Sequence, residues 1–453
     1  MKINWFSPLP PARTGIADYT FGILPELSSR ADVTLWTDRT GWDSELEKYA
    51  TVRHFQPEHV DWVELNRAEL SFYNIGNNHL HHASIWQVSR QSPGIVVLHD
   101  VRLHDFFESL YRGHWRDEPG YLAQIEKHYG EEGLRIATEF VSARHGDYDF
   151  MAQRFSMTGA VLENALGALV HTQDAFNELR AAHRCPVFYA PLPSAPIVAS
   201  NRSDGQASGP HRLIIFGHIG RNRRLDAVLD ALSQLPQRDR FQLDIYGEID
   251  DAKTVRQRIQ TLALKDTVKI HGYAPIEDLD HALSMASLAI NLRFPTMGEA
   301  SASQLRIWEH ALPSLVTRVG WYASLSEDAV AYVRPDNEVA DIRSHLEMFL
   351  ADPQKFARMG RHGRRLVETE HHPKSYASTI VSLAENAREF KLRHAAFDLA
   401  GRTGAVMGSW SKEMNDDAAA AKRVAEKIHS LTAHSFTAHS FTAQTATDTQ
   451  ARR

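Results

Sequence analysis

Short apolar runs alternate with amphipathic stretches along the first 190 residues of the chain. Apolar runs bounded by turn residues predict buried strands, and here they lie at 2–6, 33–37, 70–74, 94–99 and 166–171. The amphipathic stretch at 16–27 predicts a helix between the first two strands. A longer stretch at about 101–164, rich in His, Arg, Glu and aromatic residues, predicts a helical excursion. This alternation is typical of a doubly wound α/β domain.

The same alternation restarts after a break. Residues 191–210 are rich in Pro, Gly and Ser and are typical of an interdomain linker. The strands expected beyond it lie at 212–216, 241–246, 267–271, 288–292, 314–316 and 331–333. A helix is expected at about 373–392. The fold class predicted is therefore α/β, with two Rossmann-like, doubly wound domains that face each other across a cleft.

The pattern also sets the segment boundaries. One Rossmann-like domain is expected at 1–190 and the second at 211–372, with the linker between them. A C-terminal helix at 373–400 is expected to pack back on the first domain. Beyond residue 401 the composition shifts, and Ala-His-Ser-Phe-Thr occurs twice in succession. The tail at 401–453 is expected to be partly helical, at about 416–431, and then disordered, because it cannot bury enough apolar surface to fold alone.

Composition excludes several classes of protein. Hydrophobic residues make up 43% of the chain and charged residues 23%, which is typical of a soluble globular protein. The net charge of −6 provides no basic field for nucleic acid. The single cysteine, Cys185, excludes an internal disulfide framework and fits a reducing compartment. No run approaches the length of a transmembrane helix, and the N-terminus lacks the pattern of a signal peptide. We expect a cytoplasmic protein whose membrane contact, if it has one, is peripheral.

A glycine turn with arginines follows the strand at 212–216. Gly217 ends this strand, and Arg221, Arg223 and Arg224 flank the start of the next helix. Such a turn forms an anion site, because free N–H groups and the helix dipole point at the anion and arginine adds charge-assisted bonds. The turn predicts diphosphate binding with Arg223 as the best candidate; the alternative is a solvated basic turn.

A second turn of this kind follows the strand at 288–292. Gly298 and Glu299 precede Ser301 and Ser303, which stand where the N-cap and first turn of a helix belong. A carboxylate beside a helix N-terminus stays ionised and can accept hydrogen bonds from two adjacent sugar hydroxyls. The alternative is that Glu299 only caps the helix. Two such turns in one half of the chain indicate a ligand with a diphosphate and a polyhydroxyl group.

The chain resembles the family 4 glycosyltransferases of the GT-B fold, the bacterial retaining group often called group 1. The resemblance covers about residues 1–390. It rests on the two turns above and on three further segments, Ser7–Tyr19, Tyr73–His82 with Val97–Asp100, and Val319–Leu325. It implies an acceptor-binding first domain and a second domain that binds a nucleoside diphosphate sugar.

The resemblance also implies roles for single residues. His99, Glu299 and Arg223 would be catalytic. His99 would contact the donor sugar near the reacting carbon, Glu299 would hold its hydroxyls, and Arg223 would hold its phosphates. Ser301 and Ser303 would present N–H or hydroxyl groups to the distal phosphate. The donor-binding residues expected are Gly15, Gly217, His218, Arg221, Arg223, Gly298, Glu299, Ser301, Ser303 and Arg306.

Two positions depart from the family pattern. His218 stands where many relatives have arginine, and Arg306 stands where many have a second glutamate that grips the ribose. Glu309 lies one turn further on, so we expect a Glu309–Arg306 pair with Arg306 on ribose or phosphate. This substitution leaves the identity of the nucleotide open.

The remaining candidates lie on the acceptor side. They are Asp18, Tyr19, Asn77, Asp100 and His104, of which Asp100 and His104 either assist the acceptor or are structural. No metal site is expected: His79, His81 and His82 are not joined by a carboxylate or cysteine cluster. No cofactor is expected beyond the donor substrate.

The function expected is transfer of a hexose, with retention, from a nucleoside diphosphate sugar to a hydroxyl of a glycan or lipid-linked acceptor. The family implies bacterial surface polysaccharide synthesis, with peripheral contact at the inner face of the membrane left open. Attack would come from the front face, with the leaving phosphate oxygen taking the acceptor's proton. The alternatives are a GT-B nucleotide-sugar epimerase and a non-catalytic sugar-nucleotide binding subunit. No oligomeric state is predicted.

Overall fold

The computed structural model describes residues 1–142, 147–183, 185–194 and 209–413. Most of the linker predicted at 191–210 lies outside these residues, as do the helix predicted at 416–431 and the rest of the tail beyond residue 413. The chain divides into two compact units, Met1–Glu385 and Asn386–Arg453. Both predicted α/β domains lie in the first unit.

The first sheet has seven parallel strands in the order β3-β2-β1-β4-β5-β6-β7. The strands are β1 (Lys2–Phe6), β2 (Asp32–Thr37), β3 (Thr51–His54), β4 (Leu70–Ile75), β5 (Ile95–Leu98), β6 (Gly167–Val170) and β7 (Val187–Tyr189). The five strands predicted from apolar runs are confirmed. The two missed strands, β3 and β7, are the edge strands; they are short and half exposed, so no buried run marks them.

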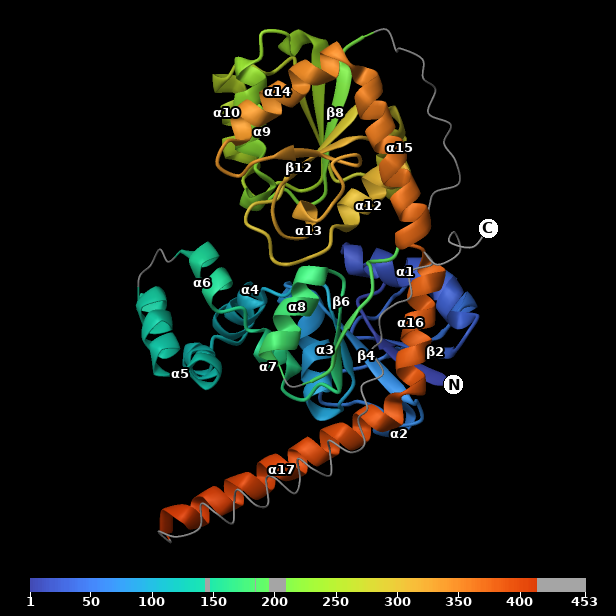
Figure 1. Cartoon of the computed structure of the whole chain (residues 1–453), viewed down its shortest axis with the longest axis vertical. Coiled ribbons are helices and arrows are strands. Elements are labelled where there is room, and N and C mark those ends of the chain that lie inside the picture. Colours follow the sequence, from blue (N-terminus) through green and yellow to red (C-terminus); the bar gives the residue numbers. More distant parts are fainter. Residues whose placement is uncertain (143–146, 184, 195–208, 414–453) are drawn as a thin grey trace, which may run out of the picture. The chain divides into compact units, whose positions relative to one another are not determined.

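Helices cover this sheet, and a group of them extends to one side (Figure 1). The covering helices are α1 (Gly15–Ser28), α2 (Trp62–Leu65), α3 (His79–Gln91) and α8 (Gln173–Ala182), with the short η1 (Ser44–Lys48). The predicted excursion consists of α4 (His104–Glu108), the π-helix η2 (Ser109–Trp115), α5 (Glu118–Ser142), α6 (Tyr148–Arg154) and α7 (Thr158–Leu162). Buried aromatic residues fix α3 and the excursion together, since Trp86 contacts Phe106 and Phe107 edge-on.

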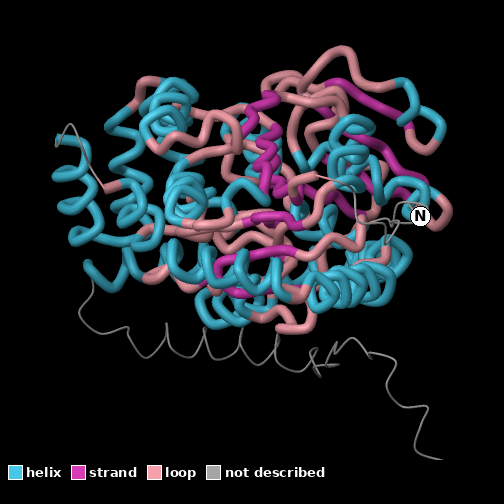
Figure 2. Tube along the Cα trace, turned by 90° about the horizontal axis from the view of Figure 1, so that it is seen from above, coloured by secondary structure: helices cyan, strands magenta, loops and turns pink. Residues whose placement is uncertain are grey.

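The second sheet has six parallel strands in the order β10-β9-β8-β11-β12-β13. The strands are β8 (His211–Phe216), β9 (Phe241–Tyr246), β10 (Val268–Gly272), β11 (Leu288–Asn291), β12 (Ser314–Thr317) and β13 (Ala331–Val333), and all six were predicted. The helical elements between and after them are η3 (Arg221–Arg223), α9 (Leu225–Gln234), η4 (Arg238–Arg240), α10 (Ala252–Thr261), α11 (Ile276–Met285), α12 (Ala302–Glu309), α13 (Gly320–Ala323), α14 (Glu338–Ala351) and α15 (Pro353–Glu370). Figure 2 shows the strands of the molecule with helices beside them.

The C-terminal helix differs from the prediction. The single helix expected at 373–392 is wrong, because α16 (Pro373–Glu385) ends before Asn386 and α17 (Ala387–Glu413) begins after it. Helix α16 packs against α1 of the first domain, where the hydroxyls of Tyr376 and Tyr19 form a buried hydrogen bond. Among the described residues, no helix is both long and apolar enough to cross a bilayer.

Candidate functional site

The two turns singled out in the sequence meet where the strand order of the second sheet reverses. Strands β8 and β11 are neighbours there, although β9 and β10 come between them in the chain. The turn at 217–224 follows the carboxyl end of β8, and the loop at 292–301 follows the carboxyl end of β11. In doubly wound sheets, ligands bind outside the carboxyl ends of the strands at this switch point.

The backbone of the first turn passes very close to its neighbours. Gly217 has φ +96°, and a Cβ atom placed there would lie 2.9 Å from Nη2 of Arg223. Gly247, at the end of β9, has φ +126°, and its Cβ would lie 1.9 Å from the carbonyl oxygen of Gly217. Both positions therefore require glycine, and together they let the turn fold over Arg223.

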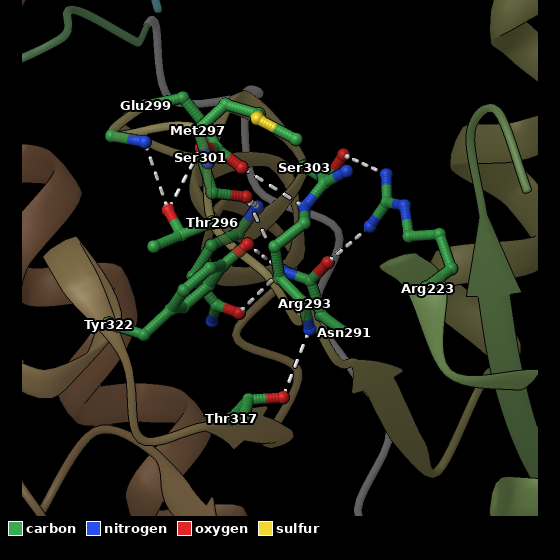
Figure 3. A network of polar contacts seen from close by, with 12 residues as sticks. Arg223, Asn291, Arg293, Thr296, Met297, Glu299, Ser301, Ser303, Thr317 and Tyr322 are labelled. Atoms are coloured by element: carbon green, nitrogen blue, oxygen red, sulfur yellow. Dashed lines mark hydrogen bonds and ion pairs between the residues drawn. The ribbon is translucent and has the colours of Figure 1, made fainter. Parts of the chain in front are cut away.

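Arg223 is a buried cation surrounded by neutral acceptors. Its side chain lies between the two turns (Figure 3) and is 6% exposed. The guanidinium donates to Oδ1 of Asn291 at 2.7 Å, to Oγ of Ser303 at 3.4 Å and to the carbonyl oxygen of His218 at 3.3 Å. Burial, and then the nearby charge of Arg293, lower its pKa to about 9, so it stays charged at neutral pH. A buried charge whose hydrogen bonds all go to neutral groups would gain from an anionic ligand.

Asn291, which the sequence analysis missed, organises this site. It is the last residue of β11 and is 3% exposed. Its Oδ1 accepts from Arg223, and its Nδ2 donates to Oε1 of Gln304 at 3.0 Å and lies 3.4 Å from Oγ of Ser301. The amide thus fixes Arg223 relative to the start of α12. A polar residue at the end of an otherwise apolar strand was the available signal.

Glu299 is held within its own loop, as Figure 3 shows. Its Oε2 accepts from the backbone N–H of Met297 at 2.7 Å and from Oγ1 of Thr296 at 3.0 Å, and its Oε1 lies 3.2 Å from Nε of Arg293. The alternative that Glu299 caps α12 is wrong, because the N-cap is Ser301, whose Oγ accepts from the N–H of Gln304 at 3.1 Å. Arg293, a second missed residue, is a half-buried partner for this carboxylate.

Ser303 and Ser301 lie at different depths at the start of α12. Ser303 is half-buried in the first turn, with its hydroxyl beside Arg223, where a phosphate oxygen could replace or join it. Ser301 is 3% exposed and its hydroxyl already serves the helix cap. Of the two, Ser303 is therefore the one with a hydroxyl at the guanidinium.

The loop after β5 in the first domain contacts the Glu299 loop. The N–H groups of Val101 and Arg102 both donate to the carbonyl oxygen of Met297, at 3.0 and 2.9 Å. Gly298 has φ +81°, and a Cβ there would lie 1.9 Å from Cγ2 of Val101. The close approach of the two loops therefore depends on a glycine at this position.

This contact brings two carboxylates near each other. Burial, and then the charge of Glu299, raise the pKa of Asp100 to about 7, while Arg293 and the N–H of Asn77 oppose that rise. The N–H of Asn77 donates to Oδ2 of Asp100 at 2.8 Å, and Oδ1 of Asn77 accepts from the N–H of Phe106. Asn77 therefore positions Asp100 and the start of α4 together.

His99 sits in a group of aromatic rings. Its Nε2 lies 3.0 Å from Oδ1 of Asn74, and its ring contacts Tyr19 edge-on, with His171 at 5.1 Å between ring centres. Burial and the neighbouring histidines hold the pKa of His99 well below its usual range, so the ring is neutral at pH 7. A neutral, oriented imidazole suits hydrogen bonding to a sugar hydroxyl better than charge stabilisation.

For His104 the structural one of the two roles left open by the sequence holds, and the acceptor-side prediction for Tyr19 is wrong. His104 is fully buried, with Nδ1 at 3.2 Å from the carbonyl oxygen of Phe155 and Nε2 at 3.1 Å from the Tyr121 hydroxyl, so neither nitrogen can meet an acceptor. The hydroxyl of Tyr19 is bonded to Tyr376, and the Tyr19 ring positions His99 instead.

The prediction of a Glu309–Arg306 pair is also wrong. Arg306 donates from Nη2 and Nε to Oδ1 of Asp280 on α11, at 2.7 and 3.0 Å. Glu309 accepts from the Ser194 hydroxyl instead, and burial raises its pKa to about 7. The guanidinium of Arg306, which was expected to contact ribose or phosphate, is therefore paired with Asp280.

The other predicted residues lie at the margin of the site. Arg221 is largely exposed and ion-paired with Asp149 of α6, and His218 lies 2.8 Å from Asp250. Gly15 opens α1, and a Cβ there would meet nothing within 4 Å, so the bare protein does not require a glycine at that position. Partial burial raises the pKa of Asp18, and Arg306 opposes the rise, which places this carboxylate in range of α12. Within the described part of the chain, no group of three or more His, Cys, Asp or Glu residues is arranged to hold a metal ion.

Comparisons with known proteins bear on the fold that carries this site. Residues 199–366 match the family model described as Glycosyl transferases group 1. No curated protein matches the sequence significantly. Among solved structures, the chain is similar to HepE of Anabaena in complex with UDP, at 14% identity and a TM-score of 0.57, covering 85% of this chain and 100% of that one. It is also similar to sucrose-phosphate synthase of Thermosynechococcus elongatus, at 15% identity and a TM-score of 0.59, covering 85% and 98%. With the two parallel sheets, these likenesses show the GT-B fold predicted from the sequence.

Proposed function

We propose that this protein is a nucleotide-sugar-dependent glycosyltransferase that moves a hexose, with retention, onto a hydroxyl of a glycan or lipid-linked acceptor. The observation that carries the proposal is the buried cation Arg223, whose three hydrogen-bond acceptors are all neutral groups. It lies beside the start of α12, where the helix dipole also favours an anion. A diphosphate would interact with both the Arg223 guanidinium and the N-terminal end of the α12 dipole.

The donor's sugar would lie toward Glu299. A carboxylate beside a diphosphate site can hold the hydroxyls of a sugar while the phosphates are bound elsewhere. Glu299 keeps its orientation through Met297, Thr296 and Arg293, so little reorganisation is needed when a sugar displaces water there. His99 lies on the loop that contacts the Glu299 loop, and its neutral ring would hold a hydroxyl of the same sugar.

The reaction would then proceed as a front-face substitution. The acceptor oxygen forms a bond to the anomeric carbon while the bond from that carbon to the diphosphate oxygen breaks. The acceptor's proton passes to the leaving phosphate oxygen, and Arg223 stabilises the negative charge that develops there. Attack from the side of the leaving group retains the configuration. The match of residues 199–366 to the group 1 glycosyl transferases supports this reaction class.

UDP is the first nucleotide to test, because HepE of Anabaena was crystallised with UDP and with UDP-glucose. A thermal-shift panel of UDP, GDP, ADP, TDP and their sugars, with and without EDTA, would identify the donor. We expect a selective rise in melting temperature with one nucleotide and no effect of EDTA. No rise with any nucleotide would refute the donor site.

Two variants test the assigned roles. Arg223→Ala should abolish the nucleotide-dependent rise and lower transfer at least about 100-fold, the scale measured when one stabilising donor is lost. Glu299→Ala should keep the rise with the free nucleotide but lose transfer. Arg224→Ala is the matched control: the neighbouring Arg224 is ion-paired with Glu338 at 2.7 Å, so its loss should lower stability and leave the nucleotide-dependent rise unchanged. Near-normal transfer by Arg223→Ala or Glu299→Ala would overturn the assignment.

A further inference from the structure

The helical excursion carries an open hollow of about 510 Å³ that the donor site does not use. It is lined by His79 from α3, by Glu108, by Arg112 and His114 from η2, and by Tyr148 from α6. The volume falls within the range of small-molecule sites. The π-helix η2 supplies most of the lining, and such irregular turns are frequent at functional sites.

The chemistry of the lining suits an uncharged polyhydroxyl ligand. Tyr148 is 50% exposed and offers an aromatic face with a polar hydroxyl at its edge. Glu108 and Arg112 offer a carboxylate and a guanidinium side by side, joined by a 2.8 Å bond. Planar polar groups next to an exposed ring can hold both the hydroxyls and the apolar face of a sugar.

The charges disfavour an anionic ligand. Arg112 is ion-paired with Glu108 and also lies 3.4 Å from Glu118, so two carboxylates offset its charge. Burial and the nearby His114 lower the pKa of His79, which is therefore neutral at pH 7. A phosphate in this hollow would meet no cation that lacks a carboxylate partner among these described side chains.

Helix α6 connects the hollow to the donor loops. Tyr148 lines the hollow, while the next residue, Asp149, pairs with Arg221 of the first turn. One helical turn further, Nε2 of Gln153 donates to the carbonyl oxygen of Thr296 in the Glu299 loop, at 3.1 Å. The hollow and the donor loops therefore lie on two sides of one helix, roughly 10 Å apart, the width of an α-helix with its side chains.

We propose that this hollow binds a neutral saccharide unit of the acceptor, remote from the hydroxyl that is glycosylated. The inference rests on the proposed glycosyltransferase function and adds that the acceptor is a glycan of more than one sugar, because a single ring cannot fill the hollow and reach the donor loops. If the hollow binds such a unit, the enzyme would favour acceptors of several sugars over a single sugar.

Saturation-transfer NMR on the full chain tests the proposal without any donor. The probes are maltotetraose, cellotetraose, mannotetraose and chitotetraose, each with its monosaccharide, and inorganic pyrophosphate as the anionic probe. We expect at least one tetrasaccharide to bind at millimolar concentration. Tyr148→Ala should weaken that binding about tenfold, while Tyr148→Phe, which keeps the ring, should retain most of it.

Phe150→Ala is the matched control, because Phe150 is equally exposed on the same helix but is not among the lining residues. It should bind the tetrasaccharide as the unmodified protein does. The hollow is refuted as a glycan site if no tetrasaccharide binds while a nucleotide of the panel still raises the melting temperature, or if Tyr148→Ala binds unchanged. Glycan binding without any nucleotide effect would instead refute the proposed transferase and leave the hollow as a glycan site.

Discussion

Gly298→Ala is the sharpest test of how the donor loop is built. Gly298 has φ +81°, and an added methyl group would lie 1.9 Å from Cγ2 of Val101. An L-residue in the left-handed region costs about 1–2 kcal/mol. Overpacking of a well-packed contact costs about 1–3 kcal/mol more. The sum is roughly 2–5 kcal/mol, which for a domain of this size lowers the melting temperature by roughly 4–20 °C.

The steric part of this cost can be separated from the backbone part. Val101→Ala removes Cγ2, and the next atom facing the new methyl group is Cβ of residue 101 at 3.4 Å, which is an ordinary contact. The double variant should therefore recover about 1–3 kcal/mol relative to the sum of the single variants, leaving the backbone strain and the cost of Val101→Ala itself.

Calorimetric melting of the four proteins in this cycle gives the coupling, and donor turnover gives the functional effect. Gly298→Ala should lower turnover roughly 100-fold, because a shift of about 1 Å in Glu299 is enough for that loss. Gly22→Ala is the control, since a Cβ there meets nothing within 4 Å and Gly22 is not among the donor-binding residues. A Gly298→Ala protein with unchanged melting and turnover, or a cycle with zero coupling, would refute this account of the loop.

Three further predictions concern residues around the site. Burial and the charge of Glu299 raise the pKa of Asp100 to about 7. The contribution of Asp100 to stability is therefore full below about pH 4 and is lost as the pH rises through 7. Asp100→Asn should melt at a higher temperature than the unmodified protein at pH 8 and at the same temperature at pH 4. Asn291→Ala should cost about 1–3 kcal/mol in denaturant unfolding and raise the KM for the donor, because Arg223 and Gln304 lose a buried partner. Arg306→Gln should change the nucleotide Kd in calorimetry by less than about twofold, whereas a tenfold loss, about 1.4 kcal/mol, would restore the expected contact with ribose or phosphate.

The sequence predicts the central strands of both sheets but not their margins. Strands such as β5 and β6 are buried on both faces and read as continuous apolar runs. The edge strand β3, Thr-Val-Arg-His, has no fully buried residue, so the pattern that marks a strand is absent. The break at Asn386 likewise carries no proline or glycine that could announce it.

Some residues of the candidate site could likewise be predicted from the sequence, whereas others could not. Gly217, Gly298, Arg223 and Ser301 could be found because turns and caps require particular residue types at fixed offsets from a strand. The bond between Arg306 and Asp280 could not be found, since it joins helices 26 residues apart in sequence. Its geometry depends on how α11 and α12 pack. Asn291 falls between these cases, because its position at the end of a strand was visible but its partners were not.

The first domain holds the Glu299 loop through hydrogen bonds to backbone carbonyl groups. Arg102 and Val101 bind the carbonyl oxygen of Met297, and Gln153 binds that of Thr296. A backbone carbonyl can accept these bonds whatever side chain it carries, so they fix the path of the loop and leave Glu299 free to serve the ligand. The acceptor-side elements therefore hold the loop that carries Glu299, while the second domain holds Arg223 through Asn291. Positioning of the sugar would then depend on both domains and binding of the phosphates on the second domain alone.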